Sequence, residues 1–294
     1  MESIFTKVKR SFAQGNLLTR LLYINVGVFL VLRLLIVLAT LFQWPDSHLM
    51  QWFQLPSSLR LLIYRPWTVI TYMFLHIDFL HILFNMLWLY WFGQIFLLFF
   101  SERQLGGLYL LGGIAGAAMF LAAYHIFPYF RNVADSTFLM GASASVMAIV
   151  FAVSFYQKQY EINLIFLGRI KLIYLAAGVL IIDLLSMASD NAGGHIAHIG
   201  GALFGILFAN RYRNGRDWTK GINSLIDNIV NLTKRKPRIK VMPGGRRPET
   251  DMEYNARKHE KMKDLDNILD KLKHSGYESL SADEKKRLFD ASKN

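Results

Sequence analysis

The chain has 294 residues, of which 53% are hydrophobic and 14% aromatic, and its mean hydropathy is +0.27. This composition excludes an ordinary soluble domain, since several segments approach the roughly 20 apolar residues that span a bilayer. The formal charge is +12, and the absence of Cys excludes disulfides and thiolate chemistry.

The charge is unevenly distributed along the chain. Residues 1–210 carry 12 Lys and Arg against 8 Asp and Glu, whereas residues 211–294 carry 21 against 13. A basic tail beside a membrane fits a cytoplasmic flank better than a nucleic-acid surface, so we expect a lipid bilayer and no nucleic acid as partner. The first apolar stretch is long and no small-residue cleavage site follows it, so no cleavable signal peptide is predicted.

Six apolar stretches are predicted to span the membrane as helices, and the last three are short. In chain order they cover about residues 21–42, 76–98, 105–124, 143–156, 171–187 and 196–210. With six spans, the loops that hold Arg103 and Lys158 lie on the same side as the N-terminal flank and the basic tail. The positive-inside rule then puts both termini in the cytoplasm, and we expect a bacterial cytoplasmic (inner) membrane.

The expected fold class is an all-α membrane protein, a six-transmembrane-helix bundle with a cytoplasmic C-terminal tail that contains a small helical segment. Residues 1–20 are the N-terminal flank and residues 21–210 the membrane domain. Residues 211–250, with Pro237 and Pro243, are predicted to be a basic linker. Residues 251–294 form the tail, whose partner is unknown.

Two helices are predicted in the tail. An amphipathic helix is predicted from its apolar face, which is formed by the regularly spaced residues Leu265, Ile268, Leu269 and Leu272. Ser279 or Ser281 is predicted to cap a second short helix. Such a hairpin buries little core by itself.

The loop from Trp44 to Tyr72 is rich in aromatic residues, with Trp52, Phe53 and Trp67 among Leu and Ile. Such an amphipathic loop is predicted to lie in the outer membrane interface. An aromatic belt that only anchors the helices is an equally good interpretation.

Four polar side chains are predicted to lie at a similar depth near the outer side. In the expected topology the second, fourth and sixth helices enter from outside, and near their starts they carry His81 with Asn85, Ser143, and His198. Polar groups inside a membrane are costly and usually functional. Their convergence therefore predicts a reactive site.

These residue types suit acyl transfer. A serine hydroxyl is a weak nucleophile until a base removes its proton, and histidine suits that task near neutral pH. His81 and Asn85 are four residues apart on one helical face, and the Ser143 N–H is unpaired at a helix start, so all three can donate to an oxyanion. One such donor typically contributes ~2.7–4 kcal/mol to the transition state.

Small residues are predicted to bring the helices close enough for this chemistry. Gly201 and Gly205 share a face with His198, while Ala144 and Ala148 continue a small-residue surface after Ser143. Small residues let helix backbones approach in lipid. The pair Gly112 and Gly116 on the third helix is interpreted as packing only.

The ordered motifs His81-x-x-x-Asn85, Gly141-Ala142-Ser143-Ala144 and His198-x-x-Gly201-x-x-x-Gly205 resemble those of the rhomboid family of intramembrane serine proteases. The resemblance covers roughly residues 66–210. It implies a rhomboid-like bundle that cleaves single-span transmembrane proteins near the outer membrane face, with lateral substrate entry between the second and fifth helices. It also implies Ser143 as nucleophile and His198 as general base of a dyad without a carboxylate. His81, Asn85 and the Ser143 amide form the implied oxyanion hole.

Three residues depart from the family pattern. Ala144 follows the serine where Gly is usual, and Met147 stands four residues after it where an aromatic is common. A thioether still packs on an imidazole or aromatic edge, so we expect altered rate or specificity rather than lost activity. Thr68 stands where the outer loop of the family commonly has Arg, so the departure affects the expected anchoring of this loop and not the dyad.

Other residues are alternative candidates for the same roles. Ser145 faces away from the side of the helix that carries Ser143, and the glycine spacing favours His198 over His195 as base. Asp183 is a lone carboxylate in the fifth helix, expected to pair locally or near the interface. No second Asp in a matching motif supports an aspartyl mechanism.

Two other classes of function remain as alternatives. A metal site would have to draw on four histidines without Cys, an HExxH pattern or a Glu base, namely His76, His81, His195 and His198. We therefore expect neither a metal nor a cofactor. A proteolytically silent rhomboid-like protein that binds membrane helices is the alternative function, and a channel or transporter would need an inverted repeat that is not seen.

Overall fold

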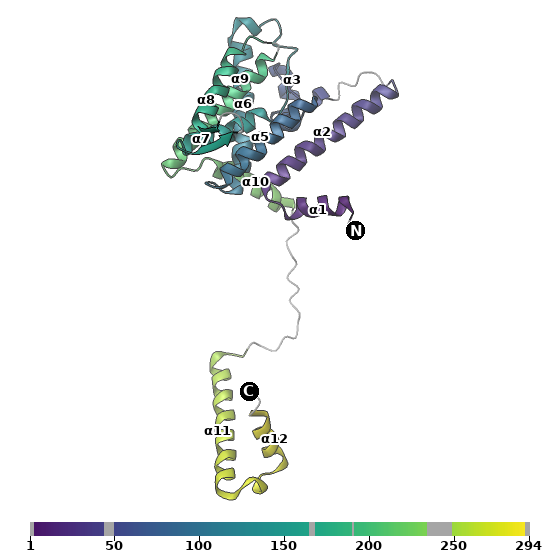
Figure 1. Ribbon diagram of the computed structural model, residues 1–294. Coiled ribbons are helices and arrows are strands. Elements are labelled where there is room, and N and C mark those ends of the chain that lie inside the picture. Colours follow the sequence, from purple (N-terminus) through teal and green to yellow (C-terminus); the bar gives the residue numbers. More distant parts are fainter. Residues whose placement is uncertain (1–2, 44–49, 165–167, 190, 234–248, 292–294) are drawn as a thin grey trace. The chain divides into compact units, whose positions relative to one another are not determined.

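The computed structural model (Figure 1) describes residues 3–43, 50–164, 168–189, 191–233 and 249–291. The chain divides into a larger unit, Met1–Lys234, and a smaller one, Arg235–Asn294. Both are built mainly of helices.

Apolar helices form the larger unit. Among the residues described, α2 (Leu17–Leu41), α5 (Phe79–Leu97), α6 (Glu102–Ile126) and α9 (Ala192–Arg213) are long and apolar enough to cross a membrane. Two shorter apolar helices, α7 (Ser143–Tyr156) and α8 (Leu172–Leu185), have 14 residues each. All six lie within a few residues of the predicted stretches, but 14 residues rise only ~21 Å, less than the ~30 Å of a bilayer core. The number of spans therefore stays a prediction.

The innermost of these helices is α7. Every residue from Ala144 to Ser154 is buried. A Cβ added at Gly201 would lie 2.0 Å from the Ala144 carbonyl oxygen, and one added at Gly205 would lie 2.3 Å from the Ala148 carbonyl oxygen. From the first pair to the second, the residue number rises by four on both helices, so α7 and α9 are parallel and begin at the same end. The prediction that these glycines bring the two helices together is confirmed.

The helix α6 packs against both α7 and α9. A Cβ added at Gly112 would lie 2.2 Å from the Ala148 Cβ, and one added at Gly116 would lie 2.5 Å from the Ala144 Cβ. Here the residue numbers run in opposite directions, so α6 is antiparallel to α7. The packing role predicted for Gly112 and Gly116 is confirmed.

Several helices begin or end at the end of the bundle opposite Ser143. The Leu17 N–H at the start of α2 donates to Glu102 at the start of α6 over 2.8 Å. The Arg213 guanidinium at the end of α9 donates to the Phe155 and Tyr156 carbonyl oxygens at the end of α7. A short helix, α1 (Ile4–Gln14), precedes α2 within the predicted N-terminal flank.

The predicted linker at 211–250 is wrong in its first half, because α10 (Thr219–Thr233) occupies part of it. Asp217 accepts from the Thr219 N–H over 2.9 Å and from the Gln104 side chain of α6, also over 2.9 Å. Arg103 pairs with Asp227 over 3.1 Å. These contacts fix α10 to α6, whereas residues 234–248 lie outside the described residues.

Short elements connect α2 to α5, namely η1 (Met50–Trp52), β1 (Leu55–Pro56), α3 (Leu59–Tyr64), α4 (Thr68–Thr71) and η2 (Tyr72–Phe74). Between α6 and α7 lie η3 (Pro128–Phe130) and β2 (Phe138–Leu139), which pairs antiparallel with β1. A second antiparallel pair, β3 (Glu161–Leu164) and β4 (Gly168–Lys171), precedes α8. The position of the 44–72 loop relative to a membrane is still a prediction, and Trp44 lies outside the described residues.

The smaller unit contains α11 (Asp251–Ser275), η4 (Tyr277–Ser279) and α12 (Ala282–Ala291). Ile268 and Leu280 are its buried apolar residues among those described. The Ser281 hydroxyl accepts from the Glu284 N–H over 3.3 Å. The predicted helix through Ile268 and the predicted cap at Ser281 are both confirmed.

Candidate active site

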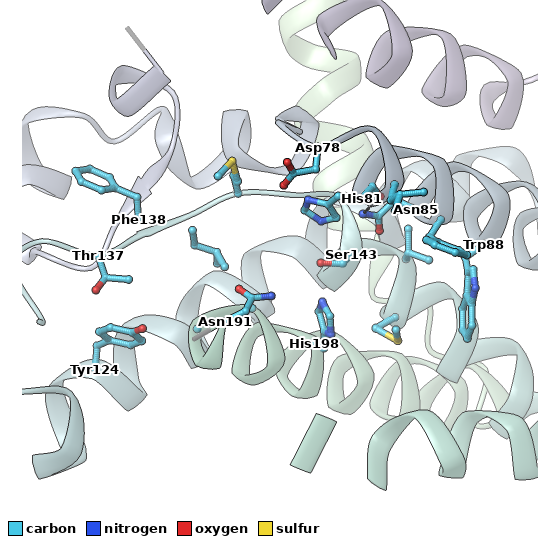
Figure 2. Close-up of a pocket in the computed structure, with 18 residues that line it drawn as sticks. Asp78, His81, Asn85, Trp88, Tyr124, Thr137, Phe138, Ser143, Asn191 and His198 are labelled. Atoms are coloured by element: carbon cyan, nitrogen blue, oxygen red, sulfur yellow. Dashed lines mark hydrogen bonds between the residues drawn. The ribbon is translucent and has the colours of Figure 1, made fainter. Parts of the chain in front are cut away.

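A cavity of about 630 Å³ lies at the end of the bundle where α7 begins. Its walls come from α5, the segment before α7, α7 itself and α9, with Tyr124 added from α6 (Figure 2). The four side chains predicted for the site, His81, Asn85, Ser143 and His198, all line it. The structure thus brings together residues that are up to 117 positions apart, counting from 81 to 198.

Ser143 is the first residue of α7, and the turn before it is tied to the η2 segment. The Gly141 N–H donates to the Tyr72 carbonyl oxygen over 2.9 Å. The Ala142 N–H donates to His76 Nε2 over 3.4 Å. The Tyr72 hydroxyl in turn donates to the Gly113 carbonyl oxygen of α6 over 2.6 Å. As a residue of the first helical turn, Ser143 has an N–H without a helical partner and near the positive end of the helix dipole.

His81 and Asn85 face this turn from α5. A Cβ added at Gly141 would lie 3.0 Å from His81 Cε1 and Nε2 and 3.6 Å from Ser143 Oγ. The His81 ring is therefore close to the serine hydroxyl, as Figure 2 also shows. The Asn85 amide donates one hydrogen to the His81 carbonyl oxygen over 3.0 Å, which leaves its other N–H available.

His198 rises from α9 towards Ser143 (Figure 2). Among the described residues, no hydrogen bond joins Ser143 Oγ to His198. Instead, His198 Nδ1 lies 2.9 Å from Asp183 Oδ1, and His195 Nδ1 lies 2.8 Å from the same oxygen. The expected dyad without a carboxylate therefore differs from the structure, in which an acidic group of α8 contacts the histidine.

Sequence reasoning missed this contact. The sequence predicts only a local or interfacial partner for Asp183, because apolar periodicity does not show which face of α8 meets α9. The available signal was an acidic residue near the end of one apolar helix and two histidines near the start of the next.

The residues weighed as rivals lie elsewhere. Ser145 is fully buried and absent from the cavity wall, and its Oγ would be 2.7 Å from a Cβ at Gly113 of α6. His195 contacts Asp183 and does not line the cavity. The two rivals are thus farther from the cavity than Ser143 and His198.

The four histidines weighed as a metal site fall into two pairs. The His76 and His81 rings pack edge to face at 5.0 Å, while His195 and His198 share Asp183. Among the residues described, Asp183, His195 and His198 form the group of His and acidic side chains that could hold a metal ion, with ligand atoms within 4.8 Å of one another.

A family model described as the rhomboid domain matches residues 64–214, just over half of the chain. The chain belongs to the rhomboid family. It is therefore an integral, multi-pass membrane protein, and the cavity lies within its rhomboid domain. A second family model, of a family of unknown function (DUF6576), matches residues 249–294.

A curated relative carries the same family name. The chain is 29% identical over 161 residues to RHOMBOID-like protein 12, mitochondrial, of Arabidopsis thaliana. The match covers 52% of this chain and 48% of the relative, so the chain spans about half the length of that protein.

The three departures from the rhomboid pattern each have a structural setting. The Ala144 methyl faces Gly116, whose missing side chain leaves room for it. Met147 lines the cavity. Thr68 is buried and donates to the Arg65 carbonyl oxygen over 2.7 Å, while the Arg65 guanidinium lies 4.1 Å from the Trp52 ring. The loop thus carries an arginine three positions before Thr68.

Proposed function

We propose that this rhomboid protein is an intramembrane serine endopeptidase that cleaves single-span membrane proteins near the outer membrane face. One observation carries the proposal: a hydroxyl, an imidazole and two further polar side chains from three helices line a single cavity. The family supports the same conclusion, because rhomboid proteases use these residue types in this order.

Each residue has a role in the proposed reaction. His198 takes the proton of Ser143 Oγ as that oxygen attacks the scissile carbonyl carbon. The resulting oxyanion accepts hydrogen bonds from the Ser143 N–H, His81 and Asn85. His198 then gives its proton to the leaving amine, and a water molecule, deprotonated by the same imidazole, hydrolyses the ester on Ser143.

The location of the cavity suits a substrate within the membrane. A 14-residue α7 is shorter than a bilayer core, so Ser143 at its start would lie below the outer surface. We propose that the substrate helix enters between α5 and α8 and unwinds there, because an intact helix hides its carbonyl groups.

The proposal includes six spans and cytoplasmic termini, in a bacterial inner membrane. Contacts between the starts of α2 and α6, and between α6 and α10, support one shared end for the N-terminal flank, the loop at Arg103 and the chain after α9. Reporter fusions after residues 15, 102 and 233 should all report the cytoplasmic side. A periplasmic signal at any of them would contradict this topology.

The deciding experiment compares wild type with Ser143→Ala and His198→Ala, using a fluorogenic single-span peptide in proteoliposomes. We expect cleavage by wild type and a loss of at least about 10³-fold in both variants. Thermal denaturation in detergent checks that both variants are folded. Cleavage that survives in Ser143→Ala would refute the assigned nucleophile, and no cleavage by folded wild type across several substrates would favour the silent helix-binding alternative.

A further inference from the structure

We propose that Asp183 is a positioning residue for His198, and that His195 holds Asp183 in place, so that the site works as a Ser–His–Asp arrangement. The inference rests on the proposed protease function and adds two residues to it. The observation is that a single oxygen, Asp183 Oδ1, lies 2.9 Å from His198 Nδ1 and 2.8 Å from His195 Nδ1.

This geometry fixes which nitrogen of His198 carries the proton. An ionised carboxylate oxygen can only accept hydrogen bonds, so both Nδ1 atoms must donate. In neutral His198 the other nitrogen, Nε2, then has a free lone pair and can take the proton of Ser143. The carboxylate also stabilises the imidazolium that forms when the proton is transferred.

The location of Asp183 on α8 makes its contacts with α9 necessary. It is buried, with 5% of its surface exposed, and lies in the last turn of a helix that ends at Leu185. A negative charge is disfavoured both within a membrane and at the negative end of a helix dipole. Contacts outside α8 must offset these costs, and the described contacts are the two histidines of α9.

The distances also favour hydrogen bonding over metal binding. Ligand atoms around a tetrahedral zinc ion, at ~2.0–2.1 Å from the metal, lie ~3.3 Å apart. The two distances to Asp183 Oδ1 are 2.8 and 2.9 Å, as expected for charge-assisted hydrogen bonds. A protease that loses activity with a chelator and regains it with zinc would overturn the positioning role.

Other titratable groups near His198 come from several elements. His81 faces it from α5, and Asp78 and Tyr124 lie farther along the cavity wall. In the described geometry only Asp183 is hydrogen-bonded to the His198 ring. Replacing Asp183 therefore tests one defined contact.

The test is Asp183→Asn in the full-length protein, assayed with the same fluorogenic peptide. Asn can donate to Nδ1 and so leave the proton on Nε2, the wrong tautomer for a base. We expect kcat to fall about 100-fold or more and KM to change less than about threefold. The matched control is Asp135→Asn, which makes the same chemical change at an exposed residue outside the cavity and should leave kcat unchanged.

His195→Gln tests the second half of the inference. We expect a smaller loss of kcat, up to about tenfold, because the Asp183–His198 bond remains. The double variant His195→Gln/Asp183→Asn should be no slower than Asp183→Asn alone, since His195 acts only through Asp183. Additive losses would overturn this coupling.

The outcomes separate the inference from the protease proposal. If Ser143→Ala is inactive but folded Asp183→Asn retains kcat within about threefold of wild type, the positioning role is wrong and the protease function stands. A rise in KM at unchanged kcat would also overturn it. If Asp183→Asn does not fold, the rate at which a fluorophosphonate labels Ser143 in His195→Gln decides: slower labelling supports the inference, and the wild-type rate overturns it.

Discussion

Gly141 sets the spacing between the serine turn and the histidine of α5. Its φ of +122° belongs to a region that residues with a side chain rarely adopt, and an added Cβ would lie 3.0 Å from the His81 ring. The backbone conformation and the close approach therefore both require glycine. A side chain here would displace the proposed oxyanion donor.

Gly141→Ala should consequently lower kcat by about 100-fold, the usual effect of losing one oxyanion donor. It should also cost ~1–2 kcal/mol of stability through backbone strain. The matched control is Gly215→Ala, because Gly215 also has a positive φ, of +73°, yet nothing lies within 4 Å of its added Cβ. Equal losses of kcat in both variants would show that strain, not displacement of His81, is the cause.

At this scale the sequence predicted part of the site. Ser143, His198, His81 and Asn85 could be grouped because helix direction and position within each helix suffice to place them at one depth. The pairing of Asp183 with His198 could not be predicted, because it depends on how α8 is rotated about its own axis. That rotation is set by side-chain packing against neighbouring helices, and it cannot be read from the apolar pattern of α8 alone.

At the scale of elements, the contact between α7 and α9 holds the proposed nucleophile, Ser143, near the proposed base, His198. The backbones approach so closely that Gly201 faces the Ala144 carbonyl group, next to Ser143. A side chain on α9 would push apart the two helices that carry Ser143 and His198. The same glycine is thus expected to affect both stability and the distance between Ser143 and His198.

Gly201→Ala is expected to destabilise the protein by at least about 2 kcal/mol, because the neighbouring atoms are backbone and cannot move aside. Activity should fall as well in any protein that still folds. Gly178→Ala is the control, since nothing lies within 4 Å of a Cβ added at this position of α8. A thermal midpoint in detergent that drops equally in both variants would contradict the role assigned to Gly201.

The helix α10 shows why the linker prediction was wrong. Lys, Arg, Pro and Gly make up 18 of the 40 residues in 211–250, and this composition hides a shorter amphipathic pattern. Ile222 and Ile226 lie one turn apart and are partly buried. Composition averaged over 40 residues favoured a linker, whereas a helix-length window would have favoured α10.

At the scale of the whole molecule, the division into two units predicts which part of the chain is needed for cleavage. Removing residues 234–294 should leave cleavage of the fluorogenic peptide within about twofold of wild type, because the described cavity residues all belong to the larger unit. Removing everything after Gly215 also deletes α10, with its contact to Arg103, and Asp217, with its contact to Gln104, and should lower the thermal midpoint. Lost cleavage in the first, well-folded truncation would refute the prediction.

The enclosure of α7 has a consequence for biosynthesis. No residue from Ala144 to Ser154 faces outward, and one wall around them is α9, which ends at Arg213 with hydrogen bonds back to the end of α7. A nascent chain that has not yet released α9 lacks both this wall and His198. If the proposed protease function is correct, the chain is therefore inactive until α9 has joined α7, and newly inserted neighbours are protected from cleavage until then.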